Sequence, residues 1–167
     1  MGLEQHRKAG EGRFGFAVIT VSDTRSGAED RGGAYLASTL EEAEHRVEQR
    51  LWVRDEADEI LAALDQAVAE PGVDAVLFTG GTGLAPRDVT VPTLEGAMET
   101  SIPGFGELFR ALSFEQVGSA TILSRACAGV VGERVVFALP GSPKALALAM
   151  ERIILPEIGH LVTQIRG

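Results

Sequence analysis

Fully apolar stretches of strand length alternate along this chain with amphipathic stretches of helical periodicity. Phe14 to Val21 and Asp74 to Thr79 are apolar almost throughout, as is typical of strands buried on both faces. Tyr35 to Arg46 and Asp55 to Glu70 repeat apolar residues at helical spacing, with acidic residues between them, which indicates helices with one buried side. Strands and helices in alternation predict a mostly parallel sheet covered by helices on both faces.

The rest of the chain continues this alternation with shorter elements. We expect strands over Val47–Val53, Ala120–Leu123 and Val135–Leu139, and helices over Thr90–Glu99, Phe105–Leu112 and Lys144–Leu155. The strand at 47–53 alternates in polarity, which places it near an edge of the sheet. The strands at 120–123 and 135–139 are candidates for an antiparallel hairpin. Pro156 should end or kink the helix before it.

Composition excludes several classes of protein. The 167 residues suit one domain, which we expect to span 14–167 after a flexible polar tail at 1–13. Acidic residues outnumber basic ones by 24 to 15, which argues against nucleic-acid and anionic-membrane surfaces, since both need clustered positive charge. Cys127 is the only cysteine, so an internal disulfide or a cysteine-rich zinc site is excluded. No targeting or membrane segment is apparent, and we expect a cytoplasmic protein.

Ligands of parallel sheets bind beyond the carboxyl ends of the strands. The loops at those ends are therefore the places to look for function. They are Ser22-Asp23-Thr24, Arg54-Asp55-Glu56, Thr79 to Asp88, Ser124-Arg125 and Pro140-Gly141-Ser142-Pro143. These loops contain hydroxyls, carboxylates and glycines, and no Ser/His/Asp arrangement for nucleophilic catalysis is apparent.

The loop Thr79-Gly80-Gly81-Thr82-Gly83 follows a buried strand directly. Glycine lets main-chain N–H groups approach a ligand and converge on it, and threonine hydroxyls add donors, so the loop is a candidate anion cradle. The alternative is a tight turn that needs positive φ. No Gly-Lys-Ser/Thr follows and the glycine spacing differs from the dinucleotide fingerprint, so the loop is neither a Walker loop nor a dinucleotide site.

Two aspartates at this edge each have two interpretations. Beside Asp88, Arg87 could hold a phosphate while the carboxylate holds a divalent metal, or Asp88 or Thr90 could cap the next helix. Asp55 is suited to cap the helix that follows it, and it also closes a strand at the same edge as Asp88.

Three other positions remain open between a structural and a functional interpretation. Ser142 is a natural N-cap with Pro143 as first helical residue, and the same turn could bind an anion. Ser124-Arg125 could contact a phosphate or form a surface pair. Cys127 is expected to be a small core residue rather than a nucleophile, because no histidine lies near it in sequence.

Together these segments make the sequence resemble the MoaB/MogA family of molybdenum-cofactor biosynthesis proteins. The matching stretches are TVSDTRSG (Thr20 to Gly27), RDE (Arg54 to Glu56), FTGGTGLAPRDVT (Phe78 to Thr90), PGFGELFRALSFEQVGSATILSRACAG (Pro103 to Gly129) and ALPGSPKA (Ala138 to Ala145). The GELFRALSF and LSRACAG segments look more like the MoaB branch. The resemblance covers nearly all of the chain from Phe14 to Leu161, in order.

The resemblance implies a three-layer α/β/α fold and a homo-oligomer, trimeric or hexameric. It also implies a molybdopterin adenylyltransferase, in which the terminal phosphate of molybdopterin attacks the α-phosphate of ATP with Mg²⁺ to give adenylyl-molybdopterin and pyrophosphate. A molybdate-insertion protein would then be a partner. The alternative is a non-catalytic protein of the same pathway that holds molybdopterin or its adenylate for a partner enzyme.

The resemblance assigns functional roles residue by residue. Asp55 and Asp88 correspond to the family's two functional aspartates and would hold Mg²⁺. The ATP- and pterin-phosphate-binding loops correspond to Ser22-Asp23, Thr79 to Gly83, Ser124 and Pro140 to Ser142. The chain departs from the family pattern at Arg54, where proline is common, and at Val91, which stands before Pro92; neither change removes a functional group. A phosphate monoester is mostly ionised at neutral pH, so this chemistry needs positioning and Mg²⁺ rather than a strong general base.

Overall fold

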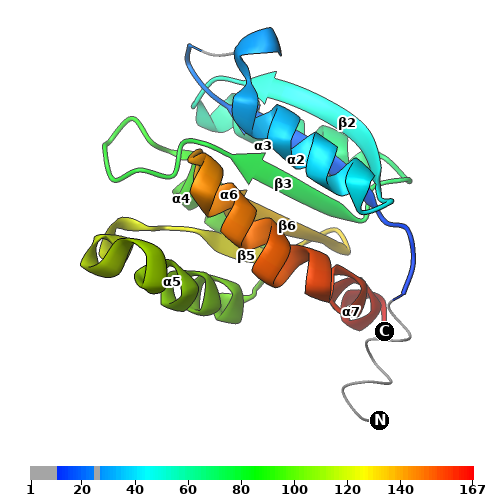
Figure 1. The fold of residues 1–167 in the computed structure, drawn as a ribbon. Coiled ribbons are helices and arrows are strands. Elements are labelled where there is room, and N and C mark those ends of the chain that lie inside the picture. The colour runs from blue at the N-terminus through cyan, green and yellow to red at the C-terminus, as the bar shows by residue number, and fades with distance from the viewer. Residues whose placement is uncertain (1–10, 25–26) are drawn as a thin grey trace.

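Within residues 11–24 and 27–167, the part of the chain described by the computed structural model, six strands form a sheet in the order β2-β1-β3-β6-β5-β4 (Figure 1). The strands are β1 (Gly15–Val21), β2 (Arg46–Val53), β3 (Ala75–Thr79), β4 (Thr100–Ser101), β5 (Cys127–Val131) and β6 (Arg134–Leu139). Four strands run parallel to one another: β1, β2, β3 and β6. β5 pairs antiparallel with β6, and β4 pairs antiparallel with β5. The predicted edge position of β2 is confirmed. Most of the expected tail, residues 1–10, lies outside the described residues.

Helices cover both faces of this sheet (Figure 1). They are α2 (Arg31–Glu42), α3 (Ala57–Ala69), α4 (Thr90–Ala97), α5 (Pro103–Val117), α6 (Pro143–Ala149) and α7 (Leu155–Arg166), with 3₁₀ turns η1 (Gly27–Glu29) and η2 (Gly118–Leu123) and the π-helical turn η3 (Met150–Ile154). α2, α5, α6 and α7 pack on one face, and α3 and α4 pack on the other. The expected three-layer α/β/α fold is confirmed.

The central strands divide their side chains between two cores. Phe16 and Val18 of β1 pack in the cluster that contains the apolar side of α2, whereas Ala17 and Ile19 pack with the apolar side of α3. All four are at most 1% exposed. Burial on both faces explains why this strand is apolar without alternation, as its sequence predicted.

The antiparallel part of the sheet differs from the expectation. The hairpin exists, but β6 pairs with Cys127–Val131, and the predicted strand at 120–123 is instead the 3₁₀ turn η2. Gly118, with φ of +60°, separates this turn from α5, and Ile122 is 84% exposed. Four apolar residues are too short a run for periodicity to distinguish strand from helix. The predicted helix at 105–112 is also longer, and the short strand β4 was not predicted.

The last helix runs past Pro156 instead of ending there. α6, η3 and α7 follow one another without a break from Pro143 to Arg166. Proline has no N–H to donate to the preceding turn, and it occupies the first turn of α7, where that donor is not needed. The Leu155 N–H bonds to the Met150 carbonyl, five residues earlier, so a π-helical turn joins the two helices. Of the two effects expected of Pro156, an end or a kink, the helix end is wrong, because α7 continues past it.

The sheet determines where the predicted loops meet. The four parallel strands point their carboxyl ends toward one edge, and β5, which is antiparallel, begins at that same edge. The described residues contain no helix that is both long enough and apolar enough to cross a membrane.

Candidate active site at the carboxyl edge of the sheet

The loops predicted to bind ligand converge at this edge. Ser22 and Asp23 follow β1 and Asp55 follows β2. Thr79 ends β3 and Gly80 to Gly83 follow it. Pro140 to Ser142 follow β6, and Ser124 precedes β5. Hydrogen bonds join several of these loops directly. The Asp55 N–H donates to Asp23 Oδ1 at 3.1 Å, and the Thr79 hydroxyl donates to the Pro140 carbonyl at 3.2 Å.

Asp55 is a buried carboxylate held by neutral donors. It is 5% exposed, and its Oδ1 accepts hydrogen bonds from the Val89 N–H at 3.2 Å and the Thr90 hydroxyl at 2.9 Å. The N-cap of α3 is Glu56, without a side-chain capping bond, so the interpretation of Asp55 as that cap was wrong. Thr90, fully buried, is a hydrogen-bond partner of Asp55 that the sequence analysis treated only as a possible cap.

The environment of Asp55 disfavours its charged form. Burial raises the pKa of this carboxyl, the bonds from Thr90 and Val89 lower it, and the nearby carboxylates of Asp88 and Asp23 raise it further. A positive charge brought beside Asp55 would relieve both the burial cost and the repulsion.

The glycine-rich loop packs directly on these carboxylates. Gly80 and Gly81 have φ of +99° and +64°, which side chains rarely adopt. A Cβ atom at Gly81 would lie 2.6 Å from Asp55 Oδ2, and one at Gly83 would lie 2.6 Å from Asp88 Oδ2. The glycines are thus required by the turn and by its close approach to the two aspartates. The anion cradle remains a prediction.

Asp88 closes its own loop. Its Oδ2 accepts from the Ala85 N–H at 3.2 Å, and its N–H donates to the Ala85 carbonyl at 2.9 Å. The N-cap of α4 is Val89, with no side-chain capping bond, so neither Asp88 nor Thr90 caps this helix as considered from the sequence. The Asp88 carboxylate is left at the same edge as Asp55.

Arg87 bridges three loops through exposed ion pairs. Its Nε and Nη2 donate to the two oxygens of Asp23 at 3.0 and 2.9 Å, and its Nη1 donates to Glu56 Oε1 at 2.8 Å. The hydrogen bonds from Arg87 hold the pKa of the Asp23 carboxyl below its usual value, and these bonds raise the pKa of Arg87 further above its usual value. A phosphate that bound Arg87 would compete with Asp23.

The loop after β6 combines a helix cap with a cavity wall. Ser142 Oγ accepts from the Ala145 N–H at 3.3 Å and Pro143 begins α6, which confirms the predicted cap. Gly141 lies against Gly80. These two glycines, together with residues of the β1 loop and of the α2 N-terminus, line a cavity of about 260 Å³. Main-chain N–H groups at a helix N-terminus favour anions.

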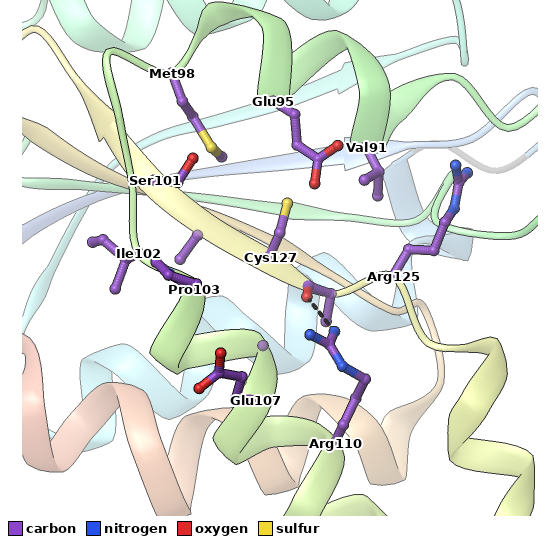
Figure 2. A pocket seen from close by; sticks show the side chains of 13 residues that line it. Val91, Glu95, Met98, Ser101, Ile102, Pro103, Glu107, Arg110, Arg125 and Cys127 are labelled. Atoms are coloured by element: carbon purple, nitrogen blue, oxygen red, sulfur yellow. Dashed lines mark hydrogen bonds between the residues drawn. The ribbon is translucent and has the colours of Figure 1, made fainter.

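A larger cavity of about 400 Å³ lies between α4 and α5 (Figure 2). Cys127 lines it beneath Glu95, and Arg110 and Arg125 also line it. Burial raises the pKa of the Cys127 thiol to about 11. The neutral thiol supports the prediction that Cys127 is not a nucleophile, although it is a cavity wall rather than a core residue.

The donor set fits a magnesium ion that is shared with a substrate. Asp55 and Asp88 supply hard carboxylate oxygens on either side of one loop. No cluster of three or more His, Cys, Asp or Glu side chains suited to a metal occurs in the described part of the chain. Mg²⁺ in such sites is commonly held by one or two carboxylates together with substrate phosphates, so two aspartates suffice.

The three-layer α/β/α fold, with a glycine-rich loop and two aspartates at the carboxyl edge of its sheet, is typical of the class of α/β proteins that bind ligands at that edge. Residues 17–160 match the family described as "Probable molybdopterin binding domain". The chain belongs to this family of molybdenum-cofactor biosynthesis proteins, and the resemblance stated from the sequence is confirmed.

The chain is similar in sequence to several molybdenum-cofactor biosynthesis proteins over nearly its whole length. Proteins named Molybdenum cofactor biosynthesis protein B from Halalkalibacterium halodurans and Bacillus subtilis are 43% and 42% identical, over 99% of this chain and 98% of each relative. A crystal structure with the same name is 40% identical with a TM-score of 0.90, covering 93% of this chain and 97% of that one. The tungsten cofactor synthesizing protein MoaB from Pyrococcus furiosus is 39% identical with a TM-score of 0.86, covering 94% and 99%.

Proposed function

We propose that this protein adenylylates molybdopterin with Mg-ATP. The observation that supports the proposal most is Asp55, a buried carboxylate whose hydrogen-bond donors are neutral and whose nearby charges include a second aspartate. Such a pair is costly without a cation, and it lies where an α/β sheet binds ligands. The membership in a molybdopterin-binding family supplies the substrate class.

The proposed reaction needs positioning more than proton transfer. A phosphate oxygen of molybdopterin forms a bond to the α-phosphorus of ATP, and the bond between the α-phosphorus and the bridging oxygen breaks to release pyrophosphate. Because the attacking phosphate is already ionised, no side chain has to remove a proton. Mg²⁺, when bound, would neutralise the charge that the two phosphates bring together.

The residues of this chain would divide the remaining work. Asp55 and Asp88 would hold the metal, with the Val89 N–H and Thr90 hydroxyl orienting Asp55. The main-chain N–H groups around Gly80 and Gly141 would receive phosphate oxygens. The predicted contacts to the nucleotide or to the pterin phosphate also include Ser22, Asp23, Arg87, Ser124 and Ser142. The trimeric or hexameric state, the molybdate-insertion partner and the cytoplasmic location also remain proposals.

The test is pyrophosphate release from molybdopterin and Mg-ATP by the wild-type protein, Asp88→Asn and Asp65→Asn. Asp65 is an exposed residue of α3 away from the edge, so its variant controls for loss of one negative charge. We expect release by the wild type and by Asp65→Asn, and at least a hundredfold slower release by Asp88→Asn, which is about 2.7 kcal/mol of transition-state stabilisation. Binding of molybdopterin without any pyrophosphate release would instead support the non-catalytic carrier.

A further inference from the structure

Arg125 reaches from the start of β5 into the loop that contains Asp88. Its guanidinium donates to main-chain carbonyls at both ends of that loop. The acceptors are Thr82 O at 3.4 Å, Gly83 O, and Asp88 O at 3.0 Å. Arg125 is therefore not the surface pair considered from the sequence, since its side chain bonds to the protein main chain. The direct phosphate contact remains a prediction.

On the side of β1 and β2, the loop is attached by Arg87, which bonds Asp23 and Glu56, and by the Val89 N–H, which bonds Asp55. Within it, Ala85 and Asp88 exchange two hydrogen bonds, which close the turn but do not attach it to the rest of the fold. Arg125 lies 37 residues from Asp88 in sequence. It precedes β5, whereas the loop of Asp88 follows β3, and β6 lies between these two strands in the sheet. Its bonds therefore tie the turn to β5.

The segment of Arg125 is itself braced. Arg110 of α5 donates from Nη1 to the Ala126 carbonyl at 2.9 Å, a bond drawn in Figure 2. Arg125 also lines the cavity between α4 and α5. A fixed backbone at 124–126 gives the Arg125 side chain a defined direction.

We propose that Arg125 is a positioning residue that sets the affinity of the site for Mg-ATP by holding the Asp88 carboxylate opposite Asp55. This inference rests on the proposed function. A planar guanidinium with several donors can bond carbonyls at both loop ends at once. A lysine ammonium keeps the charge but is a compact point donor on a flexible stem, so it cannot reproduce this bridge.

The experiment compares Arg125→Lys with Arg134→Lys. Arg134 also donates to a main-chain carbonyl, that of Gly132 at 3.0 Å, but it lies at the start of β6, at the opposite edge of the sheet. Hydrogen exchange of the Ala85 and Asp88 amides is measured without ligand, and Mg-ATP is titrated calorimetrically into each variant. Where pyrophosphate is released, the Mg²⁺ concentration for half-maximal rate is measured at saturating ATP.

We expect faster exchange at both amides in Arg125→Lys and a Mg-ATP affinity lower by about 10- to 100-fold, the usual cost of losing a group that orients a metal ligand. The Mg²⁺ requirement should rise by a similar factor, whereas a purely structural role would lower the melting temperature and leave that requirement unchanged. Arg134→Lys should match the wild type in all three measurements.

Wild-type exchange and wild-type Mg-ATP affinity in Arg125→Lys would overturn the inference. An affinity retained by lysine together with faster exchange would also overturn it, because charge alone would then suffice. Failure of the proposed function looks different: the wild type would bind Mg-ATP without releasing pyrophosphate. The role of Arg125 is then decided by the exchange and titration data alone.

Discussion

Two neighbouring carboxylates at the same sheet edge are stabilised in opposite ways. Asp23 is exposed and accepts a two-bond ion pair from Arg87, which lowers the pKa of its carboxyl. Burial of Asp55 and the carboxylates near it raise the pKa of its carboxyl, and its hydrogen bonds from neutral groups lower that pKa only in part. The Asp55 N–H donates to the Asp23 carboxylate, so the two residues are neighbours and their different pKa shifts do not come from different places in the fold.

The contrast indicates which charge serves the fold and which is available for a ligand. The Asp23–Arg87 pair, extended to Glu56, already joins the loops after β1, β2 and β3. Asp55 has a charge that the surrounding protein does not neutralise, and such groups concentrate at functional sites. Four predictions test this comparison, from the largest expected effect to the smallest.

The largest effect is expected from Asp55→Asn. Asparagine retains an oxygen that can accept from Val89 and Thr90 but removes the charge, so pyrophosphate release should fall at least a hundredfold, about 2.7 kcal/mol. The free energy of unfolding at neutral pH should stay the same or rise, because the buried charge is gone. Denaturant unfolding of Asp55→Asn and Asp23→Asn provides the comparison: the second variant should be slightly destabilised, because it loses an exposed ion pair. Greater destabilisation by Asp55→Asn would show that Asp55 serves the fold instead.

Gly81→Ala should destabilise the protein by about 1–3 kcal/mol. The new Cβ would meet Thr90 Oγ1 and Asp55 Oδ2 at 2.1 and 2.6 Å, in addition to the strain of φ at +64°. Gly118→Ala is the matched control, since Gly118 has φ of +60° and nothing within 4 Å of an added Cβ. Equal losses in denaturant unfolding would show that strain alone, without contact to the carboxylate, accounts for Gly81.

As the pH is lowered, the affinity for Mg-ATP should begin to fall at a higher pH than the pKa of an ordinary aspartate. A proton and a metal compete for the Asp55 carboxylate, so below its pKa the affinity drops about tenfold, or 1.4 kcal/mol, per pH unit. Because that pKa is raised above 3.8, the loss begins at a higher pH. Isothermal titration across pH 4 to 7, at constant ionic strength, measures the onset of this loss; an affinity that does not fall down to pH 4 would contradict the raised pKa.

The contributions of Asp55 and Asp23 to the free energy of unfolding change in opposite directions with pH. Asp55 takes up its proton more readily in the folded state, so its contribution to the free energy of unfolding increases as pH falls through its raised pKa. Asp23 holds its proton less readily when folded, so its contribution is present above 3.8 and is lost as pH falls through its lowered pKa.

The smallest effect is expected from Arg87→Gln. Its pairs with Asp23 and Glu56 are exposed, and such pairs contribute little to stability, so the melting temperature should change slightly. The pKa of the Asp23 carboxyl, followed by NMR, should rise toward 3.8. Arg54→Gln is the control, because it breaks the exposed pair with Glu59 and should leave the Asp23 pKa nearer its native value. No change of that pKa in Arg87→Gln would contradict the ion pair.

Ser142 and Asp55 show how far local sequence reasoning extends at the site. The Ser142 cap was predicted correctly because its partner, the Ala145 N–H, lies three residues away. The same rule failed for Asp55, which bonds instead to Val89 and Thr90, 34 and 35 residues along the chain. A capping rule contains no information about a competing donor from another loop. The misplaced strand at 120–123 has the same origin, since Cys127–Val131 occupies the place beside β6.

The sequence by itself determined the parallel sheet, its helical layers and the edge at which its loops meet. Run length and periodicity are local properties, and a parallel sheet then brings the carboxyl ends of its strands together whatever the loops contain. Only the tertiary structure decided which polar groups at that edge pair with one another. Arg87 meets Asp23 across 64 residues and Arg125 meets Asp88 across 37. Such pairings depend on how separate loops pack, and no local pattern encodes them.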